Sequence, residues 1–232
     1  MRRESAGARL LQVFLRRYAR REARAVAPFV LGPRVLDLGA GEAYVAEALR
    51  ELRPASICSA DVGVFARTPG PYVAYDGWRL PFSDGGFDST LILLTLHHCS
   101  APEAVLGEAL RVTRRRLIVM ESVYRSRMER FWLELLDGRL NGLRHCGRMG
   151  VAERFRTADE WQALFESRGL RVVETRWPGA WWERLVHHPL LFVLDKRPAG
   201  VLDSRGGTAW TATPRGSCSS SCGVATRRPS RR

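Results

Sequence analysis

Short apolar runs alternate with segments of helical periodicity between residues 34 and 195, and this alternation constrains the fold more than any other feature of the sequence. Runs with the length of strands lie at 35–38, 57–60, 72–75, 88–94, 117–120, 170–175 and 190–194. Helices are expected between them at 44–52, 102–112 and 157–168, and Thr157 and Glu160 have the spacing of a capping box. Such alternation is typical of an α/β fold with a mostly parallel sheet.

The two ends of the chain differ from this central part. Residues 1–30 are expected to contain an amphipathic N-terminal helix over 8–26 that packs on the domain through one apolar face. Residues 31–198 would form the domain, with an insertion at 122–157 over the carboxyl edge of the sheet. Residues 199–232 consist mainly of Gly, Ser, Thr, Pro and Arg, a composition that predicts a disordered tail.

The net charge of +13 is concentrated in the ends of the chain. Residues 1–30 contribute +6 and residues 201–232 contribute +5, whereas residues 31–200 carry only +2. Lys196 is the single lysine among 37 basic residues, which indicates a bias toward arginine codons more than selection for phosphate contacts. A nucleic-acid partner is therefore not favoured by charge alone.

The cysteines and the hydropathy indicate the compartment. Five scattered cysteines are not typical of a secreted, disulfide-bonded protein. The densest apolar run is strand-sized, shorter than the roughly 18–20 residues that a transmembrane helix needs. We expect a reduced, cytoplasmic protein without a metal site, since Cys218 and Cys222 have no second pair of ligands nearby. The arginine-rich N-terminus leaves a mitochondrial location open.

A glycine-containing turn follows the first strand, in the run Asp37–Ala43. Glycines at 39 and 41 allow a tight turn and a close approach of the backbone to a ligand at the helix N-terminus. Tyr44 occupies the position where a nicotinamide-binding fingerprint has its third glycine. Asp37 fits poorly beside a pyrophosphate but suits a ligand with an ammonium group, such as S-adenosylmethionine.

Two further acidic residues end successive strands. Asp61 lies 20 residues after Gly41, at the distance where a carboxylate accepts hydrogen bonds from ribose hydroxyls. Asp76 ends the third strand, where a carboxylate can accept a hydrogen bond from an adenine amino group. The carboxyl ends of neighbouring parallel strands border one crevice, so these three acidic residues predict a single binding site.

Taken together, these motifs resemble those of the class I S-adenosylmethionine-dependent methyltransferases over about residues 34–195. More narrowly, the chain is similar to the branch that includes the ubiquinone/menaquinone-biosynthesis methyltransferases, which has a Leu-Pro-Phe stretch, a Phe-Asp opening the fourth strand and a His-His after it. The resemblance implies a Rossmann-like seven-stranded sheet with helices on both faces and an antiparallel last strand. The motifs are Val35–Gly41, Asp61, Asp76–Asp88, Leu96–His98 and Glu108–Val112.

The resemblance also implies roles for individual residues, with S-adenosylmethionine as the cofactor. The turn after the first strand would line its methionine end, Asp61 would hold the ribose, and Val62 would lie under the adenine. Leu93 falls near the region of methyl transfer. Ala43 and the run Arg114–Arg116 depart from the family pattern, and the second departure predicts an irregular edge before the fifth strand. The implied cofactor-binding residues are Asp37, Gly39, Ala40, Gly41, Asp61, Val62, Asp76, Gly77, Trp78 and Leu93.

His97 and His98 are the candidate bases near the expected crevice. We assign His98 as the candidate catalytic residue, because a histidine there could take a proton from a hydroxyl or an acidic carbon. The alternative is that both histidines cap the strand and pack beneath the next loop. No Asn-Pro-Pro-Tyr-like run follows the fourth strand, which argues against amino-methylation of adenine or glutamine.

The sequence thus predicts an enzyme, an S-adenosylmethionine-dependent methyltransferase that acts on an oxygen or carbon of a small-molecule acceptor. Aromatic residues of the insertion and the cluster Trp177, Trp181 and Trp182 could shape an apolar acceptor pocket, or could serve only packing. Three alternatives stay open. They are an RNA methyltransferase that uses the arginine-rich ends, a catalytically silent binding or assembly protein with the same fold, and a dinucleotide oxidoreductase, which Tyr44 disfavours. The sequence does not indicate an oligomeric state.

Overall fold

The computed structural model describes residues 6–135, 155–179 and 188–196. The chain divides into two units, residues 1–198 and 199–232, and every described residue lies in the first. The tail expected at 199–232, Trp181, Trp182 and the cysteines at 218 and 222 lie outside the described residues. No helix in the described ranges is long and apolar enough to cross a membrane.

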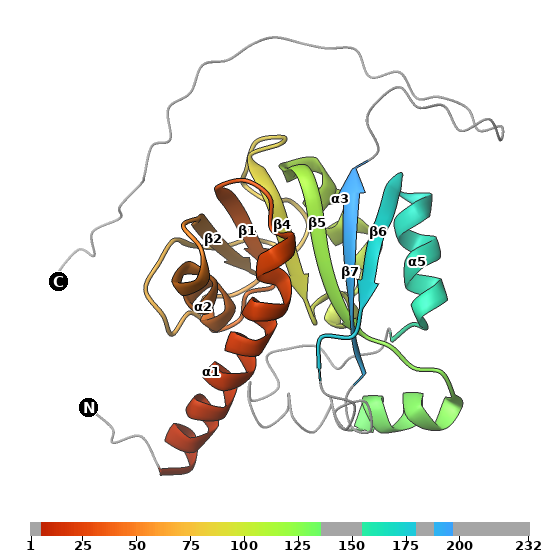
Figure 1. The fold of residues 1–232 in the computed structure, drawn as a ribbon, viewed down its shortest axis with the longest axis horizontal. Coiled ribbons are helices and arrows are strands. Elements are labelled where there is room, and N and C mark those ends of the chain that lie inside the picture. The colour runs from red at the N-terminus through yellow and green to blue at the C-terminus, as the bar shows by residue number, and fades with distance from the viewer. Residues whose placement is uncertain (1–5, 136–154, 180–187, 197–232) are drawn as a thin grey trace, which may run out of the picture. The chain divides into compact units, whose positions relative to one another are not determined.

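A seven-stranded sheet forms the centre of the fold, with strand order β3-β2-β1-β4-β5-β7-β6 (Figure 1). The neighbours from β3 to β5 pair in parallel, whereas β7 pairs antiparallel with both β5 and β6. This arrangement confirms the mostly parallel sheet and the antiparallel last strand. The strands are β1 (Arg34–Leu38), β2 (Ser56–Asp61), β3 (Tyr72–Ala74), β4 (Phe87–Leu93), β5 (Thr113–Ser122), β6 (Leu170–Arg176) and β7 (Pro189–Lys196).

Two helices cover one face of the sheet. α1 (Ala6–Val26) packs against α2 (Tyr44–Leu52) through small residues of its C-terminal half, such as Ala19 and Ala23. Val26 and Leu49 join a buried cluster with the side chains that point to this face of the sheet. A short 3-10 helix, η1 (Ala27–Phe29), then leads into β1.

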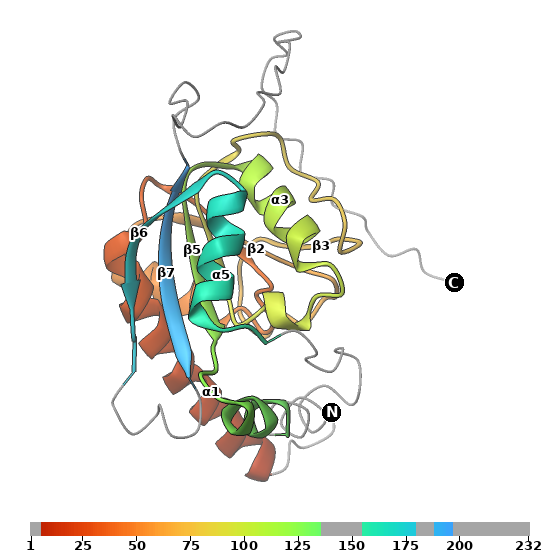
Figure 2. The ribbon, with the colours of Figure 1, turned by 90° about the vertical axis from the view of Figure 1, so that its right-hand side faces the viewer.

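Two other helices cover the opposite face (Figure 2). α3 (Pro102–Val112) and α5 (Ala158–Ser167) contribute Leu106, Trp161 and Phe165 to the larger buried cluster of the domain. The capping box expected at the start of α5 is present, because Thr157 Oγ1 accepts a hydrogen bond from the Glu160 backbone N–H and Glu160 caps the Thr157 N–H in return. The two faces together confirm a sheet with helices on both sides.

The edge before β5 is irregular, as the departure at Arg114–Arg116 predicts. α3 ends at Val112 and β5 begins directly at Thr113, so the connecting turn is missing altogether. The three arginines lie within β5 instead, and the pairing of β4 with β5 shifts register between Phe87 and Ser89. β5 is therefore longer than the run at 117–120 suggests.

The insertion expected at 122–157 is described at its two ends only. Residues 127–135 are helical, and residues 136–154 lie outside the described ranges. At its other end, Phe155 is buried with Leu133 in a small cluster against Tyr124. This cluster lies after β5 and therefore at the carboxyl edge of the sheet.

Candidate functional site

The turn between β1 and α2 approaches the end of β4 closely. Gly39 has φ +76° and Gly41 has φ +50°, which are left-handed conformations that favour glycine. A Cβ atom added at Gly39 would lie 2.2 Å from the Thr95 side chain, so only glycine fits at this position. The close contact with Thr95 therefore requires Gly39, whereas Gly41 is favoured by its backbone conformation alone.

Asp37 carries a buried carboxylate beside this turn. Its side chain is only 2 % exposed, and Oδ2 has no hydrogen-bond partner among the described residues. Burial, together with the negative charge of Asp61, raises the pKa of Asp37 to about 7, while the positive charge of Arg50 opposes this rise. A cation placed at this carboxylate would restore its charged form.

Asp61 is held at the same turn by backbone donors. Its Oδ2 accepts a hydrogen bond from the Gly41 N–H at 2.8 Å, and Oδ1 accepts one from the Val62 N–H at 2.7 Å. A carboxylate has about four acceptor positions, so further donors can still bind to it. The hydrogen bond to Gly41 joins the ends of β1 and β2 into one site, as the positions of the acids in the sequence predict.

Tyr72, which the sequence reasoning missed, fastens the turn from β3. Its hydroxyl lies 3.0 Å from the Gly41 carbonyl oxygen and 3.2 Å from the Gly63 carbonyl oxygen. Burial and the charge of Asp61 raise the pKa of Tyr72, so the phenol stays protonated and can donate at neutral pH. A tyrosine at the start of a strand carries no signal that would reveal this contact in advance.

Asp76 shapes the loop that follows β3. Its Oδ1 accepts hydrogen bonds from the backbone N–H groups of Trp78 and Arg79, both at 2.8 Å. These donors lower the pKa of the exposed Asp76 carboxyl. Gly77 has φ +84°, and a Cβ atom added there would lie 3.5 Å from a methyl group of Val62. The loops after β2 and β3 therefore meet at Val62 and Gly77.

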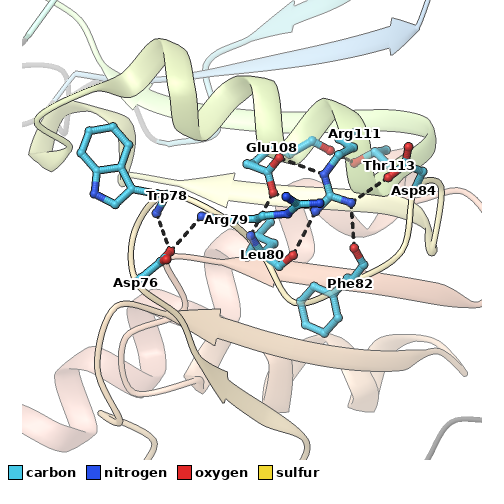
Figure 3. Close-up of polar contacts among 10 residues, drawn as sticks. Asp76, Trp78, Arg79, Leu80, Phe82, Asp84, Glu108, Arg111 and Thr113 are labelled. Carbon is cyan, nitrogen blue, oxygen red and sulfur yellow. Dashed lines mark hydrogen bonds and ion pairs between the residues drawn. The ribbon is translucent and has the colours of Figure 1, made fainter. Parts of the chain in front are cut away.

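Glu108 and Arg111 of α3 form a clamp that holds the rest of this loop through hydrogen bonds (Figure 3). Glu108 accepts a hydrogen bond from the Leu80 N–H at 2.9 Å. Arg111 binds Glu108 and Asp84 and also donates to the carbonyl oxygens of Leu80 and Phe82 at 2.9 and 2.7 Å. The sequence shows the Glu108 and Arg111 motif as a family resemblance but does not show that it binds the loop after Asp76.

The chain turns sharply after β4. Leu93, the last residue of the strand, is nearly buried, and Leu94 has φ +53°, a left-handed conformation that is uncommon for a bulky residue. The N–H groups of Thr95 and Leu96 both donate to Oε1 of Glu121, at 3.1 and 2.6 Å. The strained turn is thus held by a carboxylate from the neighbouring strand.

Glu121 also positions the two histidines. Its Oε2 lies 2.5 Å from Nδ1 of His97, and both side chains are buried. The His97 ring packs against Phe155 on one side and His98 on the other, with ring centroids 4.8 and 4.1 Å away. His98 is half-buried at the end of the 3-10 helix η2 (Leu96–His98). Sequence reasoning missed Glu121, although it follows a buried strand as Asp37 and Asp61 do.

The acceptor side of the site is only partly described. One hollow among the described residues lies between α1 and α2 and another lies near Leu31 and Lys196, and neither is lined by a predicted site residue. Trp177 packs against the larger core cluster. No group of three His, Cys, Asp or Glu side chains within the described ranges could hold a metal ion.

Comparison with known proteins agrees with this geometry. A family model described as a methyltransferase domain matches residues 36–119. A demethylmenaquinone methyltransferase of Beutenbergia cavernae is 41% identical over 98 residues, which cover 39% of this chain and 41% of the relative. The chain thus spans less than half the length of this curated relative.

Two solved structures share the fold. A chain from the complex of the Haloferax volcanii Trm112 methyltransferase activator with its methyltransferase has a TM-score of 0.62 at 17% identity, covering 77% of this chain and 90% of that one. The magnesium protoporphyrin IX methyltransferase of Synechocystis, solved with bound SAH, has a TM-score of 0.55 at 14% identity and covers 84% and 89%. Both comparisons concern the fold alone.

The fold, the strand-end acids and the matched segment make this domain similar to the class I S-adenosylmethionine-dependent methyltransferases. Within this class, the chain is similar to the menaquinone/ubiquinone branch. The cofactor that this family implies is S-adenosylmethionine, and the residues present fit it. The buried Asp37 carboxylate, whose Oδ2 has no hydrogen bond from the described residues, suits its ammonium group. The narrow turn at Gly39 places backbone next to that carboxylate.

Proposed function

We propose that this protein transfers the methyl group of S-adenosylmethionine to an oxygen or carbon of a small, largely apolar acceptor. The observation that carries the proposal is the buried Asp37 carboxylate beside a glycine turn, one oxygen of which has no hydrogen bond within the part of the chain that the structure describes. A buried acceptor without a partner costs about 1–3 kcal/mol. Such a group is expected where a ligand supplies the missing donor.

The cofactor supplies an electrophilic methyl group on a sulfonium. Asp37 would bind its ammonium group, with the backbone of Gly39, Ala40 and Gly41 alongside. Asp61 would accept hydrogen bonds from the ribose hydroxyls. The adenine would lie between the loops that meet at Val62 and Gly77, with Asp76 and Trp78 at its edge and Leu93 near the reacting group.

His98 is the candidate base in this scheme. It stands at the carboxyl end of β4, where it would take a proton from the acceptor as the new bond forms. His97 is buried against Glu121, so its position is fixed, and its stacking on His98 would orient the neighbouring ring. His97 is thus a positioning residue and not a second base.

A quinone is the acceptor that the relatives favour, since they are named demethylmenaquinone methyltransferases. The apolar cluster of Tyr124, Leu133 and Phe155 at the carboxyl edge would suit a flat, apolar ring. An apolar acceptor of this kind binds mainly by burying its apolar surface, so its pocket needs few charged side chains. The near-neutral charge of residues 31–200 supports a small molecule over RNA.

The direct test supplies methyl-labelled S-adenosylmethionine together with demethylmenaquinone or, separately, total RNA of the source cells. Label is expected in the quinone and not in RNA. A His98→Asn variant should keep cofactor affinity and lose methyl transfer, whereas His97→Asn should lower the melting temperature as well. Label in RNA would establish the RNA methyltransferase instead, and label in neither acceptor despite cofactor binding would favour the silent binding protein.

A further inference from the structure

The N-terminal half of α1 exposes an apolar patch to water. Leu10 is 73 % exposed and Phe14 is 64 % exposed, and Leu11 and Val13 beside them are exposed as well. The C-terminal half of the same helix is buried normally against α2 through Ala19 and Ala23. A cluster of large exposed apolar side chains on one helix end marks an interaction site more often than a random surface does.

Arginines follow this patch along the same face of the helix. Residues 10, 14, 17 and 21 share one stripe at helical spacing, so Leu10 and Phe14 lead directly to Arg17 and Arg21. Arg16 and Arg20, on the side facing α2, form ion pairs with Glu47 and Glu51. Across Ala6–Val26 six arginines stand against a single glutamate, so the exposed side of α1 is strongly basic.

A second patch of the same character lies on the helical segment 127–135. Met128 is 71 % exposed and Phe131 is 58 % exposed, with the exposed Trp132 in edge contact with Phe131. Exposed arginines at 125 and 127 stand beside them. In both ribbon views the N-terminal half of α1 and this segment extend from the same end of the domain, the end where the parallel strands finish (Figures 1 and 2).

We propose that these two patches dock the protein on the surface of an anionic lipid bilayer. Leu10, Phe14 and Phe131 would enter the boundary between headgroups and acyl chains, and the arginines behind them would contact lipid phosphates. Charge complementarity selects this partner. An RNA would use the arginines but leave the aliphatic side chains in water, and a second copy of the chain would bring two arginine-rich faces together.

The docked orientation would affect how an acceptor reaches the site, and this part of the inference rests on the proposed function. The patches lie at the carboxyl edge of the sheet, where Asp37, Asp61 and His98 also lie. An apolar acceptor dissolved in the bilayer would therefore reach the site without crossing water. Docking itself needs no catalysis and is measured independently of it.

The test is flotation of the full-length protein with vesicles of phosphatidylcholine, either alone or with about 30 mol% phosphatidylglycerol. The phosphatidylglycerol makes the vesicle surface strongly anionic. Binding is expected only to the anionic vesicles. Leu10→Ser/Phe14→Ser should weaken it about tenfold or more by removing apolar burial. Arg17→Gln/Arg21→Gln should weaken it about tenfold by removing two phosphate contacts.

Matched controls separate docking from other effects. Leu52→Ser/Val173→Ser removes two exposed apolar side chains outside the patches, and Arg115→Gln/Arg168→Gln removes two exposed arginines elsewhere, so both variants should float like the parent. All variants should keep the parental melting temperature and cofactor affinity. Flotation unchanged by the Leu10 and Phe14 substitutions would overturn the proposal. RNA binding lost only in the arginine variant, or a dimer lost in the apolar one, would replace the bilayer by those partners.

Discussion

Two places at the carboxyl edge of the sheet bury a carboxylate, and they differ in how its oxygens are used. At the end of β5, Glu121 accepts hydrogen bonds from two backbone N–H groups and contacts His97, so both oxygens are occupied. At the end of β1, Asp37 is equally buried, but one of its oxygens has no partner among the residues described at 6–135, 155–179 and 188–196. The protein itself thus supplies hydrogen bonds to both oxygens of Glu121, whereas one oxygen of Asp37 can still accept a hydrogen bond from a ligand.

This difference in hydrogen bonding indicates which of the two carboxylates binds a ligand. Burial of a carboxylate is costly, and a protein normally offsets the cost with donors of its own, as it does at Glu121. At Asp37 burial instead raises the pKa to about 7. We infer that the end of β5 is a rigid support, whereas the ends of β1 and β2 form the binding side.

The largest effect is expected at the support. Glu121→Ala leaves two buried N–H groups and His97 without their acceptor, so it should lower the free energy of unfolding by about 3–5 kcal/mol. Urea denaturation measures this loss. Glu121→Gln is the control, because its amide oxygen can still accept from the N–H groups and should retain part of the stability. A loss under about 1 kcal/mol for the alanine variant would contradict the role of Glu121 as a support.

On the binding side, Asp61→Ala should weaken S-adenosylmethionine by on the order of 2–3 kcal/mol, or about 30- to 150-fold. The reason is the loss of a charged acceptor for the ribose hydroxyls. Titration calorimetry measures the affinity, and Asp61→Asn serves as the control that keeps the shape. Undiminished affinity in both variants, or binding of a nicotinamide cofactor by the parent protein in place of S-adenosylmethionine, would refute the assignment.

The clamp on α3 should have an intermediate effect on stability. Arg111→Met keeps the length of the side chain but removes its hydrogen bonds to the loop carbonyl groups and to Glu108 (Figure 3). We expect a loss of about 2 kcal/mol in the free energy of unfolding. Hydrogen exchange at Leu80 should also become faster. Unchanged exchange there would mean that the loop does not depend on the clamp.

The smallest effect is expected from the C-terminal segment. Truncation after Pro198 removes a segment that is poor in large apolar residues, so the melting temperature and the cofactor affinity should stay the same. The free energy of unfolding should change by less than about 0.5 kcal/mol. A clear fall in melting temperature would show that residues 199–232 belong to the folded structure.

The sequence predicts this site unevenly, for a physical reason. Strand periodicity, glycine turns and acids at strand ends are local signals, so Asp37, Gly39 and Asp61 could be identified without coordinates. Glu121 binds His97 from 24 residues away along the chain, and Tyr72 and Arg111 bind Gly41 and Leu80 from 31 residues away. Contacts of this kind arise only when neighbouring strands and helices pack together.

The long β5 illustrates the same limit. Three consecutive arginines are not typical of a strand, and the sequence suggests an irregular turn at Arg114–Arg116. In the structure all three lie within β5. Arg116 pairs with Ser89 of β4 and with Asp195 of β7, and its side chain binds Asp195 at 2.7 Å. Tertiary pairing outweighs the local preference of the residues.

Asp37 offers the closest test of the division between support and binding side. Because its pKa is raised to about 7, the folded protein without ligand holds a proton that the unfolded chain has lost above about pH 4. The free energy of unfolding contributed by this group therefore falls as the pH rises from about 4 to about 7. Asp37→Asn should remove this fall and should make the ligand-free protein more stable at pH 8.

The affinity for S-adenosylmethionine, measured by calorimetry between pH 5.5 and 7.5, is the most direct measurement. The ammonium group needs the charged carboxylate, so binding must release the proton of Asp37. We predict that affinity weakens about tenfold for each pH unit below about 7 in the parent protein. Asp37→Asn should bind weakly at every pH in this range and show no such slope. An affinity independent of pH in the parent, or parental affinity in Asp37→Asn, would contradict the account.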